Sequence, residues 1–270
     1  MRPLLLLGIA IGCASAAGTQ PDATEIIRRS VQTIEADWKR APEYSFVERD
    51  VEGKHHATPT IKTYQVLMID GSQYNQVIAI NDRPLSSGEQ AEEGNKLRAE
   101  VLRRGHESDR ERHKRIARFL KERDQDHSML KEMVDAFDFR PAGEANIDGH
   151  DCWVFNAEPK PGYQPKTRET KVLSGMKGKL WVDKSQYQWV RVEAEVMRPV
   201  SMYGLIARVG PGTHFFLEQA PVAGNLWLPT HFSVSVKASA LGFINEDSVD
   251  DETYRQYKPM PNLAELEAHK

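Results

Sequence analysis

The chain has 270 residues, a mass of 30.6 kDa and a formal net charge of −3. This nearly balanced charge excludes the strong basic field expected of a nucleic-acid-binding protein. Hydrophobic residues make up 40% of the chain, which is ordinary for a globular protein, and the length allows one large domain or two small ones.

The first residues, MRPLLLLGIAIGCASAAG, combine a basic start, a short apolar run and a small-residue ending, as in a secretory signal peptide. The apolar run is far shorter than the roughly 20 residues of a membrane span. Cleavage after Ala16 would give an exported, periplasmic protein, whereas lipidation of Cys13 would anchor it to a membrane. We predict a signal peptide at 1–16 and a single domain at 17–270, in which Cys152 has no disulfide partner.

A helix opens the domain and strands follow it. Apolar residues recur at helical spacing between Asp22 and Arg40, and Asp22 with Glu25 resembles a capping box. The turn Asp70-Gly71-Ser72 is typical of a hairpin. Strands are predicted at Tyr44–Val51, Lys62–Ile69 and Gln73–Ile80.

Residues 85–136 form an insertion that is charged and helical in composition. Glu89 to Glu132 holds eleven acidic and twelve basic residues, a balance that predicts a solvated surface instead of a basic patch. A break near Gly105 and Ser108 divides the insertion into two helices, the second with a narrow apolar stripe. We expect it to act as a lid over the domain or as a projecting arm.

The second half of the chain is dominated by strands that are apolar on one face. A large antiparallel sheet of this kind twists and curls. We therefore predict an α+β fold, in which an N-terminal helix and the central helical insertion accompany a large curved antiparallel sheet, a half-barrel. The strands are predicted at Cys152–Ala157, within a hairpin at 177–196, and at Thr213–Ala220, Leu226–Ala240 and Val249–Tyr257, before a loose tail at 258–270.

The concave face of this sheet is the candidate ligand site. Its apolar residues would bind a hydrocarbon ligand unless the protein's own side chains fill the space. Candidate lining residues come from the strands and from the insertion: Trp153, Phe155, Trp181, Val190, Val192, Val196, Phe232, Val234, Val236, Ile116, Phe119 and Leu120.

Common catalytic signatures are missing from the sequence, including G-x-S-x-G, H-E-x-x-H, C-x-x-C and the P-loop. We predict no enzymatic activity, no bound metal and no cofactor. Cys152 is interpreted as a buried structural thiol. The acidic run at 246–252 is interpreted as a solvated loop, and surface positions are expected for His106, His113 and His127.

The order of elements resembles the outer-membrane lipoprotein-sorting superfamily, the LolA-like proteins and their LolB and RseB relatives, including exported bacterial members. The segments that carry the resemblance are EIIRRSVQTIEADW leading into YSFVERDVEG, the central helices, GHDCWVFNAEPKPG, GKLWVDKSQYQWVRVEAEV and GNLWLPTHFSVSV. The resemblance implies a half-barrel around a lid of helices, an apolar cavity for acyl chains and no catalytic residues. The insertion departs from it in being longer and more charged than a compact lid.

Two functions follow as hypotheses. The first is a periplasmic carrier or sensor that binds a lipid acyl chain or a lipidated protein on the concave sheet face. The second is a non-enzymatic envelope scaffold or regulator with a self-filled core, which would bind a protein partner through residues 86–136. Neither involves nucleic acid.

Overall fold

The computed structural model describes residues 22–54, 57–202, 207–240, 244–245 and 247–260. The predicted signal peptide and Cys13 lie outside these ranges, as does most of the predicted loose tail at 258–270. The start of that tail is wrong, because Lys258 and Pro259 belong to strand β15 (Ser248–Pro259). Within the described ranges, no helix combines the length and the apolar character needed to cross a bilayer.

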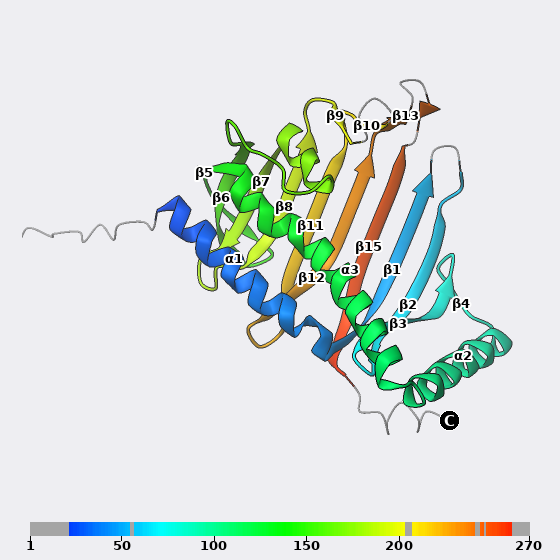
Figure 1. Ribbon diagram of the computed structural model, residues 1–270. Coiled ribbons are helices and arrows are strands. Elements are labelled where there is room, and N and C mark those ends of the chain that lie inside the picture. The colour runs from blue at the N-terminus through cyan, green and yellow to red at the C-terminus, as the bar shows by residue number, and fades with distance from the viewer. Residues whose placement is uncertain (1–21, 55–56, 203–206, 241–243, 246, 261–270) are drawn as a thin grey trace, which may run out of the picture.

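An open, curved, eleven-stranded antiparallel sheet forms the body of the molecule (Figure 1). Strand β15 lies inside it, because it pairs with β1 on one side and with β12 on the other. Strand β15 therefore joins the N-terminal strands to the rest of the sheet, and the predicted α+β fold is confirmed. From edge to edge the strands are β4 (Arg83–Pro84), β3 (Ser72–Ile80), β2 (Thr60–Ile69), β1 (Tyr44–Lys54), β15 (Ser248–Pro259), β12 (Leu226–Val236), β11 (His214–Ala223), β8 (Trp189–Val196), β7 (Met176–Asp183), β6 (His150–Pro159) and β5 (Phe137–Ile147).

One predicted strand is divided between the large sheet and a second, small sheet. The alternation over 226–240 predicted a single strand, but β12 ends at Val236 and a new strand begins at Ala238. Lys237 turns the chain between them, since its N–H donates to Thr213 Oγ1 and its carbonyl accepts from Gly210 N. The small sheet has the order β14 (Ile244–Asn245), β13 (Ala238–Ala240), β10 (Ala207–Val209) and β9 (Val200–Ser201).

Helix α1 (Ala23–Arg40) lies across the concave face and continues into the 3₁₀ turn η1 (Ala41–Glu43). The predicted capping box at Asp22 is wrong, because its side chain makes no capping hydrogen bond. Glu25 instead accepts hydrogen bonds from Arg28 and Arg29 on the next turn.

The insertion forms two helices, α2 (Ser87–Gly105) and α3 (Asp109–Ala136). The predicted break between them is confirmed, and each helix begins with a capping box, Ser86 with Glu89 and Ser108 with Glu111. Figure 1 shows α3 crossing the concave face beside α1, while α2 lies at the β3–β4 edge. The short helix η2 (Glu169–Gly175) interrupts the predicted loop before β7.

The main core lies between the helices and the concave face, and a bulge in β8 decides which residues reach it. The pairing of β7 with β8 shifts register between Trp181 and Val182. Val192 and Val196 pack in the main core, but Val190 packs with Trp181 in a smaller cluster that includes Cys152. The alternation predicted Val190 and Val192 on one face. This is wrong because Val190 is the extra residue of the bulge, between Trp189, which pairs with Val182, and Arg191, which pairs with Trp181.

Candidate functional site

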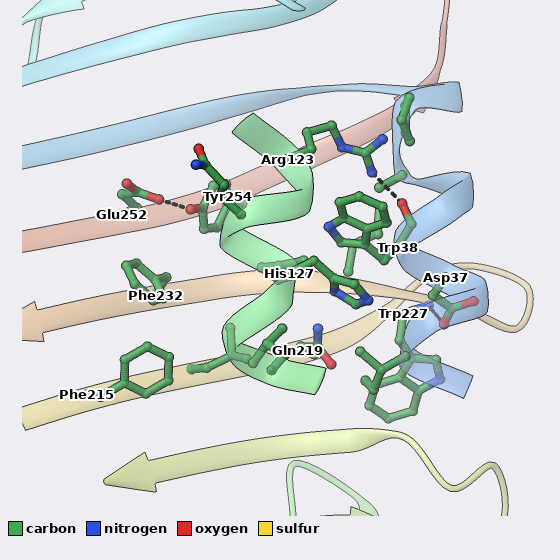
Figure 2. A pocket seen from close by; sticks show the side chains of 18 of the residues that line it. Asp37, Trp38, Arg123, His127, Phe215, Gln219, Trp227, Phe232, Glu252 and Tyr254 are labelled. Carbon is green, nitrogen blue, oxygen red and sulfur yellow. Dashed lines mark hydrogen bonds between the residues drawn. The ribbon is translucent and has the colours of Figure 1, made fainter. Parts of the chain in front are cut away.

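A cavity of about 900 Å³ lies between helices α1 and α3 and the concave face of the sheet. Figure 2 shows Trp38 of α1 and His127 of α3 at one side, with Phe215 and Phe232 of the sheet at another. The site is therefore built by α3, α1 and the sheet together.

Aromatic and aliphatic side chains make up most of the cavity wall. The rings of Phe215 and Phe232 meet edge to face with centroids 5.2 Å apart, and those of Phe46 and Tyr257 lie 5.1 Å apart. Such a wall favours hydrocarbon over a polar ligand. Further apolar lining comes from Ile34, Val66, Met68, Leu130, Met133, Phe137, Leu173, Met176 and Leu217.

Buried hydrogen bonds fix α1 to the sheet. The Asp37 carboxylate accepts from Gln188 Nε2 at 2.6 Å and from the Trp227 backbone N–H at 2.9 Å. Ser30 Oγ accepts from the Trp189 indole N–H at 2.8 Å. Because buried polar groups are costly to leave unpaired, α1 forms a fixed wall of the cavity.

Three side chains stack where α1 meets α3. The Arg123 guanidinium lies 3.8 Å from the centroid of the Trp38 ring, and the His127 ring stacks on Trp38 at 4.4 Å. Arg123 also donates to the Trp38 carbonyl oxygen at 2.5 Å. This contact places two nitrogen-rich side chains of α3 on the wall of an otherwise apolar cavity.

His127 is buried, with 2% of its surface exposed, so the predicted surface position is wrong. Burial and the nearby Lys131 lower its pKa to about 4, so the ring is neutral near pH 7. Its Nδ1 atom has no hydrogen-bond partner among the described residues, and neither has Oε1 of Gln219 on the cavity wall. By contrast, His106 and His113 are exposed, as predicted.

A row of carboxylates lies beside the apolar wall. Glu48, Asp50, Asp250 and Glu252 alternate on the face of β1 and β15 that also carries Phe46. Burial and the neighbouring carboxylates raise the pKa of Glu48 to about 7 and that of Asp50 to about 6. Ionising this row therefore costs free energy in the folded protein.

The same row corrects the interpretation of the acidic run as a solvated loop. Asp250, Asp251 and Glu252 lie half-buried on β15, because their strand is paired on both sides. Among the described residues, Asp50, Asp250 and Glu252 bring one carboxylate oxygen each within 4.8 Å of one another, the spacing of a possible cation cluster.

The structure places the predicted lining residues in several environments. Phe119 and Phe232 line the cavity. Trp153, Phe155, Val192 and Val196 pack in the main core, and Trp181 and Val190 pack in the cluster on the opposite face. Val234, Val236 and Ile116 are half-buried, and Leu120 is 49% exposed.

Several cavity residues were missed by the sequence reasoning, above all Trp38, Arg123 and His127. Arg123 and His127 are four residues apart and therefore share one face of α3. That spacing was the available signal, but the many charges of the insertion concealed it.

Cys152 is fully buried, as predicted, and burial with the nearby Asp183 raises its thiol pKa to about 11. A thiol with this pKa is almost entirely protonated at neutral pH and is a poor nucleophile. It therefore adds no catalytic group to the site.

No protein-family model and no curated protein sequence matches the chain. Solved structures with a similar arrangement include a DUF1329 family protein from Desulfovibrio piger, with 11% identity, a TM-score of 0.34 and coverage of 89% of this chain and 94% of that chain. A LolA superfamily protein from Nitrosomonas europaea has 11% identity and a TM-score of 0.29, covering 86% and 96%. The structure of the MucA/MucB complex of Pseudomonas aeruginosa has 11% identity and a TM-score of 0.25, and the match covers 90% of this chain and 100% of that chain.

Proposed function

We propose that this protein is an exported, non-enzymatic carrier or sensor that binds an acyl chain in the cavity beneath α3. The observation that carries the proposal is the apolar cavity of about 900 Å³, which lies within the range of small-molecule binding pockets. Each methylene buried there would contribute about 0.8 kcal/mol before the cost of ordering the chain. The ligand would be a lipid or the acyl chains of a lipidated protein.

The alternative hypothesis, a scaffold with a self-filled core, receives less support. Side chains of the concave face, including Phe215 and Phe232, border an open hollow. Export, periplasmic location or a lipid anchor at Cys13 would follow from the N-terminal segment, and proteolytic mapping of the mature N-terminus would distinguish them.

The test is binding of a fluorescent fatty acid to protein purified without detergent, together with native mass spectrometry for co-purifying lipid. Ala194 lies on β8 and lines the cavity, so Ala194→Phe would fill part of it. We expect this variant to lose most of the uptake. Ala117→Phe on the exposed face of α3 is the matched control and should retain it.

A clean apo mass combined with no uptake by the unmodified protein would contradict the proposal. Equal uptake by both Ala→Phe variants would show that the fatty acid binds elsewhere. Circular dichroism of each variant would verify that the fold is unchanged.

A further inference from the structure

A second, polar hollow of about 390 Å³ adjoins the cavity, between α2, α3 and β3. The two hollows share Gln73, Phe119 and Arg123 as lining residues. The polar hollow, which we call the arginine hollow, is lined by two glutamates, Glu100 and Glu122, and by five arginines. These are Arg103, Arg104, Arg115, Arg118 and Arg123.

Three of these arginines hold the hollow together. Arg104 is 4% exposed and donates to the carbonyl oxygens of Ile69 and Ser72 at the β2–β3 turn. Arg115 donates to Ser72 Oγ at 2.7 Å and pairs with Glu107, which also pairs with Arg103. Their donors are engaged by the protein, so they build the walls and orient α2 and α3.

Arg118 and Arg123 differ from these three. Within the described ranges, neither has a carboxylate within ion-pair distance. Arg123 is half-buried and uses one N–H to reach the Trp38 carbonyl, although a guanidinium has five. A half-buried cation without a counter-ion is costly, and an anion bound beside it would offset that cost.

A second polar group points to the same ligand. His127 lies one turn beyond Arg123 on α3, is 2% exposed and lines the cavity with Nδ1 unpartnered. A ligand that enters at Arg123 would pass this nitrogen before reaching the apolar wall of Phe215 and Phe232. The apolar and cationic regions are thus joined in the order that an amphiphile requires.

We propose that the two hollows together bind an anionic phospholipid, with its acyl chain in the cavity and its phosphate in the arginine hollow, held by Arg118 and Arg123. This inference rests on the proposed acyl-chain function and assigns the class of headgroup. Guanidinium groups suit phosphate because their parallel N–H groups donate to two oxygens at once.

The test compares loading from vesicles of dioleoyl-phosphatidylglycerol and of dioleoyl-phosphatidylcholine, which have identical chains. Native mass spectrometry of the re-isolated protein measures the fraction that carries each lipid. Both lipids carry an ionised phosphate, but the choline cation of phosphatidylcholine offsets that charge beside the arginines. We therefore expect phosphatidylglycerol to load about tenfold better. Arg118→Gln and Arg123→Gln should each remove most of this preference, because each takes one positive charge from the arginine hollow.

Arg112→Gln is the matched control, since Arg112 is exposed on α3 and lines neither hollow. Arg123→Gln also removes the bond to Trp38 and could disturb folding, whereas Arg118 makes no such bond and Arg118→Gln keeps the test valid. Thermal denaturation of all three variants separates lost binding from lost structure.

The outcomes distinguish the two levels of the proposal. Equal loading of both lipids, unaffected by the arginine variants, would overturn the assignment of an anionic headgroup to the arginine hollow but leave the acyl-chain function in place. No loading of either lipid, with no fatty-acid uptake, would contradict both. Binding of inorganic phosphate without any lipid loading would also overturn the amphiphile assignment.

Discussion

Charged groups border the cavity in two regions, and the pKa of a glutamate is lowered in one region and raised in the other. In the arginine hollow, Glu100 accepts from Arg103 and Arg104, and these bonds lower its pKa to about 2. On β1, Glu48 has carboxylates as neighbours and its pKa is raised to about 7. The pKa values of these two glutamates therefore differ widely, because arginines lie beside Glu100 and carboxylates lie beside Glu48.

The comparison shows where a charged ligand is expected. The helical side pairs Glu100 with arginines and, among the residues that the structure describes, retains two arginines without carboxylate partners. The β1–β15 side holds acids that take up or release protons near neutrality. An anion suits the first region at any pH near 7, whereas the second responds to pH itself.

The largest effect should come from removing a wall of the arginine hollow. Arg104→Met leaves the carbonyl oxygens of Ile69 and Ser72 buried without their donor and separates α2 from the β2–β3 turn. We expect the free energy of unfolding to fall by about 3 kcal/mol or more, since breaking a buried charged network leaves unpaired groups behind. Urea denaturation measures this loss.

Arg103→Met is the control on the same helix, because the Arg103 side chain is 53% exposed and its partners Glu100 and Glu107 keep their pairs with Arg104 and Arg115. Its cost should stay below about 1 kcal/mol. Equal costs for the two variants would show that Arg104 is no special link between α2 and the sheet.

The acidic row should produce a fall in stability as pH rises. Glu48 has a folded-state pKa of about 7, above its value near 4.3 in an unfolded chain. Between those values the folded protein binds more protons, so the free energy of unfolding decreases with increasing pH. Glu48→Gln should remove a decrease of about 1 to 3 kcal/mol between pH 4 and pH 8.

Other charged and titratable groups lie near Glu48, so the control must be a glutamate away from them. Asp50 and Asp250 add negative charge, Lys62 opposes it, and Tyr64 lies on the neighbouring strand. Glu193→Gln, at an exposed position of β8, should leave the slope unchanged. A Glu48→Gln protein with the slope of the unmodified protein would refute the assignment.

At acidic pH, the arginine hollow should show the opposite slope. Glu100 contributes stability above its unfolded pKa, and this contribution is lost as pH falls toward 2. Stability curves of Glu48→Gln and Glu100→Gln should therefore change on different sides of about pH 4.5.

Local patterns predicted much of the fold, because strands and capped helices have short-range signatures. The alternation at β8 and the Ser108 break in the insertion are examples, and the curved sheet followed from the one-sided strands. The bulge at Val190 and the end of β12 at Val236 depend on partner strands, which periodicity does not reveal.

The site was harder to predict because its walls meet only in three dimensions. Phe119 and Phe232 were selected from apolar patterns and line the cavity. Trp38 and Arg123 lie 85 positions apart, and their contact depends on how α3 crosses α1. His127 looked like a solvated histidine because its neighbours in sequence are charged, although its neighbours in space are aromatic.

The smallest expected effect concerns the start of α3, where the helical region is fastened. Ser108 Oγ accepts from the Glu111 backbone N–H, and the Glu111 carboxylate accepts from the Ser108 N–H. Ser108→Ala should lower the free energy of unfolding by about 1 kcal/mol, the usual value of an N-cap, and lower amide protection in the first turns of α3 about fivefold.

Ser86→Ala is the matched control, because it removes the equivalent capping box from α2, and hydrogen exchange is measured for both variants. Only the Ser108 change should speed exchange near Arg115 and, through it, weaken the order of the arginine hollow. Similar effects of both variants on α3 would mean that the two helices open as one unit.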